Sequence, residues 1–261
     1  MEKFVTVKTD RYDIPAIVTL PQGGNFPCVI MCHGTASDKN EAGNMYKDLA
    51  ASLCEKGIAS IRFDFAGCGD SKVSTICQTF MAEVADTAAV YDYICNTGKV
   101  NTARIGIIGF SQGGRVMAQF LSDHGEKIKA AVSWSGACHN GAGVMQGWFD
   151  AFYDAAVEKG YADIPMGWRE PLRLPLGWFD DIKSTKPFDA LTAYKGSLLA
   201  VGGRNDMLVP CEHVDEIISL NDSWTGVIYD DADHTFNCLS DDISVAQDCI
   251  LMTAEWFSEN L

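Results

Sequence analysis

The chain has 261 residues, of which 47% are hydrophobic and 21% charged, and its formal net charge is −15. This length fits one large domain or a domain with an insertion. The negative charge argues against partners such as nucleic acid or anionic membrane surfaces. No stretch approaches the roughly 18 apolar residues of a membrane span, and the N-terminus lacks the apolar region of a signal peptide.

The ten cysteines and five histidines show no metal-binding pattern. Neither a Cys-x-x-Cys pair nor a His-x-x-x-His spacing occurs, so we expect no metal site. Several cysteines lie inside apolar runs, where the residue behaves as a small hydrophobe. Free thiols without an export signal indicate a cytoplasmic protein. The oligomeric state is not predicted.

Apolar runs alternate with helical patterns along most of the chain. Two opening strands, paired antiparallel, are predicted at 3–8 and 14–20. Further strands are predicted at 26–31, 58–63, 104–109, 128–134, 197–201 and 225–229. Helices are predicted at 44–56, ending at Gly57, and at 80–96, 112–123, 211–220 and 243–261. This alternation predicts an α/β fold with a mostly parallel sheet covered by helices on both faces.

The alternation fails after the sixth strand, in a segment rich in aromatic residues and prolines. We interpret residues 136–187 as a cap inserted into a core of residues 1–135 and 188–261. A segment of this length inside a compact domain is usually functional. We expect it to form a pocket for an apolar or aromatic group, although its aromatic residues could equally be the insertion's own core. The substrate-binding candidates are Trp148, Phe152 and Trp178.

The sequence Gly109-Phe-Ser111-Gln-Gly113 follows an Ile-rich strand and precedes a helical pattern. A serine on a sharp strand-to-helix turn adopts an unfavourable φ, and backbone must pass close to its neighbours two residues away. Glycine is suited to those neighbours because it lacks a Cβ. The exposed hydroxyl then lies beside a helix N-terminus. We therefore predict that Ser111 is a catalytic nucleophile.

A serine nucleophile needs a base and an orienting carboxylate. His234 lies in a loop before the last helix, and Asp206 follows the strand 197–201, at the sheet edge where active sites form. The order Ser, Asp, His is that of one particular fold. The alternatives are a surface-loop histidine and an ordinary Asn-Asp turn. Three aspartates adjoin His234, but side chains so near in sequence rarely face the imidazole from behind: Asp230, Asp231 and Asp233.

Backbone N–H groups of Thr35 and Gln112 are the predicted oxyanion-hole donors. Thr35 follows His33-Gly34 at the end of an earlier strand, where glycine lets N–H groups turn inward. The alternative is that Thr35, together with Ser37, simply caps a helix.

Four motifs in matching order resemble the α/β-hydrolase superfamily: His33-Gly34-Thr35, Asp64-Phe-Ala-Gly67-Cys-Gly69-Asp70-Ser71, Gly109-Phe-Ser111-Gln-Gly113 and Asp206…His234. The second motif and the insertion look most like the cinnamoyl (feruloyl) esterases, although Thr35 stands where a bulky apolar residue is common in them. The resemblance implies a serine carboxylesterase that forms an acyl-enzyme on a small-molecule ester, with neither a metal nor an organic cofactor.

Other functions are compatible with these motifs. A thioesterase, an acylglycerol lipase-like hydrolase or a small-peptide hydrolase would use the same residues. A different class is a non-catalytic small-molecule binding protein on the hydrolase fold. The joint presence of the serine, the aspartate and the histidine favours an enzyme, because a binding protein has no need of all three.

Overall fold

A computed structural model describes residues 1–261, and its centre is a sheet of eight strands. The strand order is β1-β2-β4-β3-β5-β6-β9-β10. The bounds are β1 (Glu2–Lys8), β2 (Asp13–Thr19), β3 (Phe26–Cys32), β4 (Ala59–Phe63), β5 (Val100–Phe110), β6 (Ala130–Trp134), β9 (Ser197–Gly203) and β10 (Thr225–Tyr229). Strand β2 pairs antiparallel with β1 and β4, and all other neighbours are parallel. The predicted α/β fold with a mostly parallel sheet is confirmed.

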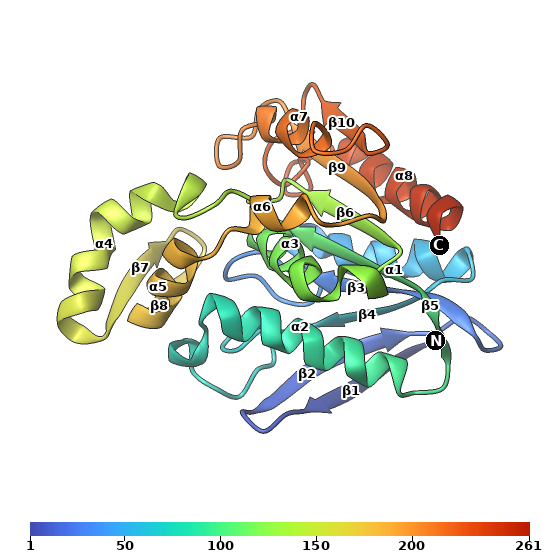
Figure 1. The fold of residues 1–261 in the computed structure, drawn as a ribbon, viewed down its shortest axis with the longest axis horizontal. Coiled ribbons are helices and arrows are strands. Elements are labelled where there is room, and N and C mark those ends of the chain that lie inside the picture. Colours follow the sequence, from blue (N-terminus) through green and yellow to red (C-terminus); the bar gives the residue numbers. More distant parts are fainter.

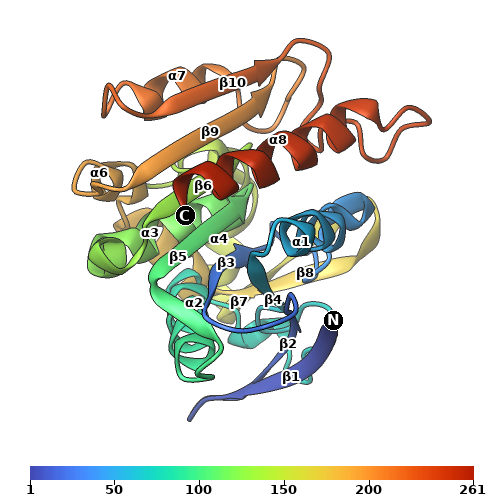
Figure 2. The same cartoon turned by 90° about the vertical axis from the view of Figure 1, so that its right-hand side faces the viewer.

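Helices cover both faces of the sheet (Figures 1 and 2). One face carries α1 (Met45–Glu55) and α8 (Ser244–Asn260); the other carries α2 (Phe80–Cys95), α3 (Gln112–His124), α6 (Pro187–Leu191) and α7 (Glu212–Ile218). Successive side chains of a strand point to opposite faces. In β3, Ile30 therefore joins one apolar core and Met31 the other. Burial on both faces explains why these strands read as continuous apolar runs.

Most boundaries of the predicted elements lie within two residues of the prediction, and the largest difference is at the start of β5. Strand β5 begins at Val100, which pairs with Phe26, rather than at Arg104. Of the added residues, only Val100 is buried and apolar, whereas Asn101 is half-buried and Thr102 and Ala103 are exposed, so the sequence shows no apolar run there. Helix α1 begins at Met45, after a short 3-10 turn. The 3-10 turns are η1 (Ala42–Asn44), η2 (Thr75–Cys77), η3 (Gly125–Lys127) and η4 (Gly143–Met145).

The segment in which strand–helix alternation was expected to fail has regular structure of its own. It contains α4 (Gln146–Lys159), a two-stranded antiparallel sheet of β7 (Tyr161–Met166) and β8 (Arg169–Pro175), and α5 (Leu176–Ser184). Figure 1 shows these elements together at the left of the view, beside the N-terminal end of α2. Prolines fit in both strands because a two-stranded sheet leaves each strand an open edge.

A buried arginine joins both ends of this segment to the core. Arg115 of α3 is 1% exposed, and its guanidinium donates to the carbonyl oxygens of His139 and Gly141 at 2.8 Å and of Ile182 at 2.9 Å. Burial lowers the pKa of Arg115 to about 10, so the group still carries its charge at neutral pH. The planar guanidinium thus holds the start of the insertion, at His139 and Gly141, and its end, at Ile182.

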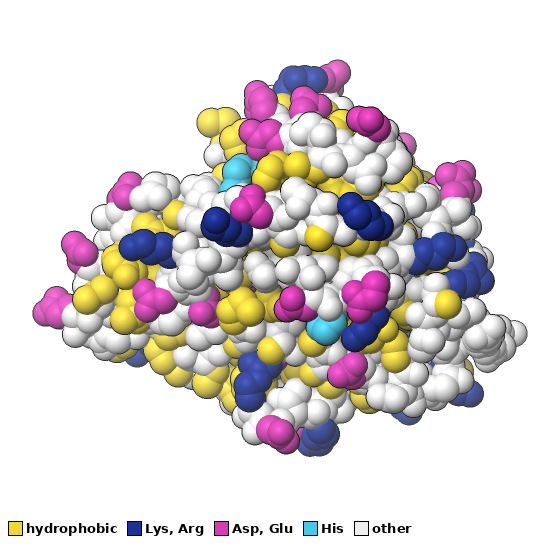
Figure 3. Space-filling view, in the orientation of Figure 1, with side chains coloured by type: hydrophobic (Ala, Val, Ile, Leu, Met, Phe, Trp, Pro, Cys, Tyr) yellow, Lys and Arg dark blue, Asp and Glu magenta, His cyan; other side chains and the backbone are white.

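No helix combines the length and the apolar character needed to cross a membrane. In the face that Figure 3 draws, acidic and basic side chains are interspersed rather than gathered into one single-sign patch. The charged side chains of this face are therefore of mixed sign.

We expect Arg115→Met to lower the free energy of unfolding by about 3 kcal/mol, because one buried and two half-buried carbonyls lose their donor, and a fully buried group left without a partner costs roughly 1–3 kcal/mol. The matched control is Arg173→Met, which removes an exposed pair with Asp163 at 2.7 Å and should leave stability nearly unchanged. Urea unfolding of both variants provides the measurement. Equal destabilisation by the two substitutions would contradict the role given to Arg115.

Candidate active site

Ser111 occupies a strained turn between β5 and α3. Its φ is 52° and its ψ is −118°, which an L-residue adopts only when the surroundings impose it. A Cβ on Gly109 would lie 2.2 Å from the carbonyl oxygen of Gly113, and a Cβ on Gly113 would lie 2.0 Å from the carbonyl oxygen of Cys32. The close backbone approach expected from the sequence is therefore present at both glycines.

The turn places Ser111 against a histidine and a carboxylate from two later loops. The Ser111 hydroxyl lies 3.0 Å from His234 Nε2, and His234 Nδ1 lies 2.7 Å from Asp206 Oδ2. The other carboxylate oxygen accepts the N–H groups of Leu208 and Val209, both at 2.8 Å. The Asp206 side chain is wholly buried, and that of His234 is 14% exposed. The carboxylate is thus fixed, and it orients the imidazole with Nε2 toward the serine.

The three aspartates near His234 in sequence have other partners or none. Asp230 pairs with Arg204 at 2.7 Å on the surface. Asp233 accepts hydrogen bonds from the N–H groups of Thr235 and Asn237, at 2.8 Å each, and so shapes the loop. The Asp231 side chain is exposed and makes no hydrogen bond.

Thr35 and Gln112 lie side by side next to Ser111. The Thr35 hydroxyl donates a hydrogen bond to the side-chain carbonyl oxygen of Gln112 at 2.8 Å. The backbone N–H of Thr35 donates to no acceptor within the protein. Gln112 is the first residue of α3, so its N–H has no intrahelical partner. Both N–H groups are therefore free for a ligand oxygen, and the hydroxyl of Thr35 caps no helix.

Two buried residues that the sequence did not single out for this role shape the loop around Thr35. Glu41 accepts the Gly34 N–H and the Ser37 hydroxyl, each at 2.6 Å. His33 accepts the Phe65 N–H at Nε2 and faces the Gly34 carbonyl with Nδ1, at 2.7 Å. Nδ1 therefore carries the proton. In the sequence, only the dipeptide His33-Gly34 after the strand pointed to this loop. Glu41 looks like an ordinary surface residue there.

The Asp64-to-Ser71 motif forms a tight turn held by charge. Asp64 is buried and accepts from the Lys39 ammonium at 2.6 Å and from the Asp70 N–H at 2.9 Å. Lys39 also pairs with Asp70 at 2.8 Å, which lowers the pKa of that carboxyl. Gly69 has φ 50°, and a Cβ there would lie 2.2 Å from the Asp64 carboxylate. These residues form hydrogen bonds and ion pairs with one another, which indicates a structural role for the motif.

The inserted segment approaches the site through β8. Arg169 donates to the carbonyl oxygen of Ala36, next to Thr35, at 3.0 Å. Trp178 does not fit the expected contact with substrate, because it is completely buried against Phe179 and Trp148, with ring centroids 5.1 and 5.8 Å away. Trp148 and Phe152 are only partly buried. For Trp178, the alternative of an internal core residue agrees with the structure.

The fold brings together one cluster of potential metal ligands: His139, His213 and Glu216. Their spacing in the sequence gave no sign of it. The two imidazoles stack face to face, with centroids 3.5 Å apart and planes inclined by 15°. Their nitrogen lone pairs therefore lie in nearly parallel planes and do not converge on one ion. Burial lowers the pKa of both histidines, that of His139 to about 4, as suits a neutral stacked pair.

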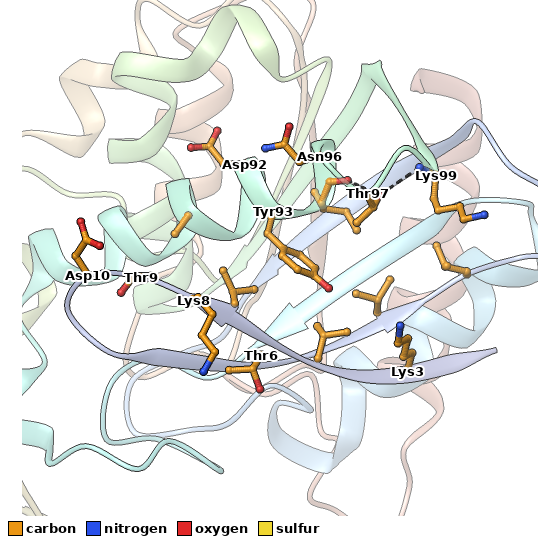
Figure 4. A pocket seen from close by; sticks show the side chains of 16 residues that line it. Lys3, Thr6, Lys8, Thr9, Asp10, Asp92, Tyr93, Asn96, Thr97 and Lys99 are labelled. Carbon is orange, nitrogen blue, oxygen red and sulfur yellow. Dashed lines mark hydrogen bonds between the residues drawn. The ribbon is translucent and has the colours of Figure 1, made fainter.

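A groove of about 900 Å³ lies far from Ser111, between strands β1 and β2 and the C-terminal half of α2. Figure 4 shows Tyr93 over the strands at its centre. The polar side chains around it are spread along the groove and do not converge on a point. The cluster around Ser111 is accordingly the candidate active site.

Comparisons with known proteins agree with this fold. Residues 27–165 match the family model of the alpha/beta hydrolase fold. A curated relative, a putative carboxymethylenebutenolidase from Methylorubrum extorquens, is 30% identical over 135 residues, which are 47% of this chain and 45% of that protein. The aligned part thus spans less than half the length of this relative.

Two solved structures resemble nearly the whole chain. Est1E from Butyrivibrio proteoclasticus, with ferulic acid bound, has a TM-score of 0.77 at 20% identity and covers 98% of both chains. The esterase domain of a Rhodothermus marinus protein has a TM-score of 0.70 at 18% identity, covering 99% of this chain and 98% of the other. Sequence identities this low indicate a shared fold and not a shared function. With the family match, they establish that the chain belongs to the α/β-hydrolase family.

We expect Asp206→Asn to slow labelling of Ser111 by a fluorophosphonate by about 10⁴-fold, as loss of the orienting carboxylate does in a comparable triad. An amide at this position favours the wrong imidazole tautomer. Asp231→Asn is the matched control and should label like the wild type. Mass spectrometry of the modified peptide gives both rates. The reverse ranking would show that another carboxylate orients the histidine.

Proposed function

We propose that this protein is a serine carboxylesterase that hydrolyses its substrate through an acyl-enzyme on Ser111. The observation that carries the proposal is the line of contacts from Ser111 through His234 to Asp206, beside two unpaired backbone N–H groups. A nucleophile, an oriented base and oxyanion donors at one point are the requirements of acyl transfer.

In the first half of the proposed reaction, Ser111 Oγ attacks the ester carbonyl while its proton passes to His234 Nε2. The carbonyl electron pair moves to the oxygen, which the N–H groups of Thr35 and Gln112 stabilise. Asp206 stabilises the imidazolium through Nδ1–H. The C–O bond to the alcohol then breaks, and the leaving oxygen takes the proton from Nε2.

In the second half, water replaces the alcohol. His234 removes a proton from water while the water oxygen attacks the acyl carbon. A second oxyanion then forms beside the N–H groups of Thr35 and Gln112. Collapse of this intermediate breaks the bond to Ser111 Oγ, which recovers its proton from Nε2. The acid is released, and no proton or electron is left unaccounted for.

For the substrate, we propose aryl or medium acyl esters such as hydroxycinnamate (feruloyl) esters, with residues 136–187 acting as a cap. The motif resemblance to cinnamoyl esterases supports this choice. The hydrogen bond from Arg169 to the Ala36 carbonyl also supports it, because Arg169 belongs to the insertion and Ala36 adjoins Thr35. A thioesterase or an acylglycerol lipase-like hydrolase is the alternative with the same chemistry.

The decisive test replaces the nucleophile. Ser111→Ala should lower kcat for ester hydrolysis by about 10⁶-fold, as loss of the serine does in a comparable triad. The fold should persist, since the hydroxyl contributes little to the core; circular dichroism checks this. More than a tenth of the wild-type activity in the purified variant would refute the proposal, and stoichiometric substrate binding without turnover would favour a binding protein.

The proposed cap residues can be tested by selectivity. Trp148→Ala and Phe152→Ala should each lower kcat/KM for a hydroxycinnamate ester relative to an acetyl ester by roughly 2- to 12-fold, since an aromatic pair contributes about 0.5–1.5 kcal/mol. Phe4→Ala, which removes a 72% exposed ring from β1, is the control and should leave the ratio unchanged. An unchanged ratio in both cap variants would contradict an aromatic acyl site at these residues.

A further inference from the structure

One edge of the central sheet is an open strand. Strand β1 stands first in the sheet order, so it pairs with β2 on one side only. It has seven residues, contains neither proline nor a bulge, and is exposed along most of its length. Figures 1 and 2 both show β1 at the lower rim of the molecule, with no other element beyond it. Such an edge offers unpaired backbone N–H and C=O groups to another strand.

The pairing with β2 shows which backbone groups of β1 are unpaired. Met1 and Leu20 exchange both N–H···O bonds, at 2.7 and 3.1 Å. Hydrogen-bonded pairs alternate along an antiparallel ladder, so every second residue after Met1 bonds to β2 and the residues between face outward. Pro15 agrees with this alternation, because it lies opposite Thr6, has no N–H, and accepts from the Asp64 N–H on the side of β4. The outward-facing residues are Glu2, Phe4, Thr6 and Lys8.

These outward-facing residues carry complementary side chains. All of them lie on one face of the sheet, because successive side chains of a strand alternate. The acidic Glu2 stands at one end of β1 and the basic Lys8 at the other. Between them lies Phe4, whose ring is 72% exposed. A strand with an acid at one end and a base at the other is complementary to an antiparallel copy of itself.

Backbone and charge select the same antiparallel register. Outward-facing residues must lie opposite one another, so a shift by one residue forms no regular ladder. When Val5 lies opposite Val5 of a second copy, the two strands overlap over their whole length, and Glu2 of each copy lies opposite Lys8 of the other. The two Phe4 rings then become diagonal neighbours on one face, within reach of each other. A shift by two residues shortens the overlap and separates both pairs of opposite charge.

We propose that this protein forms a symmetric dimer in which two β1 strands pair antiparallel about Val5 and continue the sheet from one copy into the other. A twofold dimer of this kind uses the same surface on both copies and therefore closes on itself. It satisfies the open backbone groups of β1 and covers the exposed Phe4 rings. The dimer does not depend on the chemistry at Ser111.

The charged residues at the proposed interface can bind a second partner without losing the first. Glu2 contacts the Arg62 guanidinium at 2.8 Å, and its side chain is still 42% exposed. Lys8 pairs with Asp13, and its side chain is still 74% exposed. Both ends of β1 are therefore accessible to the opposite charge of another copy.

The other face of β1 also accepts this pairing. It borders the groove of about 900 Å³, where Lys3, Val5 and Val7 lie near Tyr93 of α2 (Figure 4). In the proposed register Val5 meets its own copy on this face, and Lys3 lies opposite Val7. No charges of the same sign are placed opposite each other.

The first experiment measures the mass of the full chain by sedimentation equilibrium. We expect twice the 28.4 kDa of one copy. Thr6→Pro should give the mass of one copy, because proline removes an outward N–H and obstructs the approaching strand without removing a bond to β2. Thr6→Val is the matched control; it keeps the N–H and should remain dimeric. Circular dichroism should show that both variants are folded.

Two results of this first experiment would overturn the proposal. One is a wild-type protein with the mass of a single copy at every concentration up to about 1 mM, where even weak association is detected. The other is a Thr6→Pro variant that dimerises as strongly as the wild type, since the dimer would then use another surface.

The second experiment tests the register by cross-linking and does not require the proline variant to fold. In the proposed dimer the two residues at position 5 form a pair without hydrogen bonds, with Cα atoms about 4.5 Å apart, a distance that a disulfide spans. Mild oxidation should therefore link two copies of Val5→Cys, and mass spectrometry should identify the linked peptide. Phe4→Cys and Thr6→Cys are the controls; each faces a different residue and should link to itself far less.

The ten native cysteines require a further control, which is wild-type protein oxidised in the same way. A linked peptide that contains position 5 in both copies supports the pairing about Val5. Self-linking of Phe4→Cys or Thr6→Cys in preference to Val5→Cys would show another register, and no linking in any of the three variants would show that β1 does not pair with itself; both results refute the proposal.

Discussion

The structure depends on a backbone crossing at which two positions, Gly109 and Gly113, have no room for a side chain. The turn at Ser111 brings the carbonyl of Gly113 within reach of Gly109, and the carbonyl of Cys32 within reach of Gly113. Any side chain there would separate β3, β5 and α3. Because the crossing holds these elements together, the end of β3 lies beside the start of α3, and Thr35 meets Gln112. The strain at Ser111 is therefore the local consequence of a packing requirement, and it exposes the hydroxyl.

Buried charges then fix the loops around this crossing. Glu41 holds the loop after β3, Asp64 with Lys39 holds the turn after β4, and Arg115 holds both ends of the insertion. Buried charged groups admit few arrangements, because each one left without partners is costly. Such groups are suited to loops that must keep a defined position without regular secondary structure. Glu83 belongs to the same set, with the difference that burial favours its neutral form.

The insertion adds a second layer to this arrangement. Its aromatic side chains form a core continuous with that of the main sheet, so it is packed against the hydrolase core and not loosely attached. One of its charged side chains, Arg169, donates to the Ala36 carbonyl next to Thr35. In the proposed esterase, changes in this segment would alter the acyl group accepted without moving Ser111. This separation of chemistry from selectivity explains how one fold serves many substrates.

Features that depend on neighbouring residues in the chain could be predicted from the sequence. The strands and helices followed from apolar periodicity, and the turn at Ser111 followed from its two glycines, because both are set by local backbone and side-chain geometry. Asp206 and His234 could be proposed from their positions after strands, although only the folded chain brings them within hydrogen-bonding distance of each other. Residues 136–187 could not be divided into elements, since short strands with prolines have no clear period.

The burial of individual charged and aromatic side chains was decided only by the tertiary structure. Glu41, Glu83 and Arg115 look like ordinary charged residues of a loop or a helix, and Trp178 looks like any aromatic residue of the insertion. Glu83 and Arg115 acquire their roles from partners far away in the chain, Gln112 and Ile182 respectively, whereas the partners of Glu41 and Trp178 include residues nearby in the sequence. The physical reason is that protonation, hydrogen bonding and access to a ligand depend on which groups surround a side chain in space. The sequence determined the strands and helices of the core and the position of the nucleophile, whereas long-range packing decided which side chains surround the nucleophile.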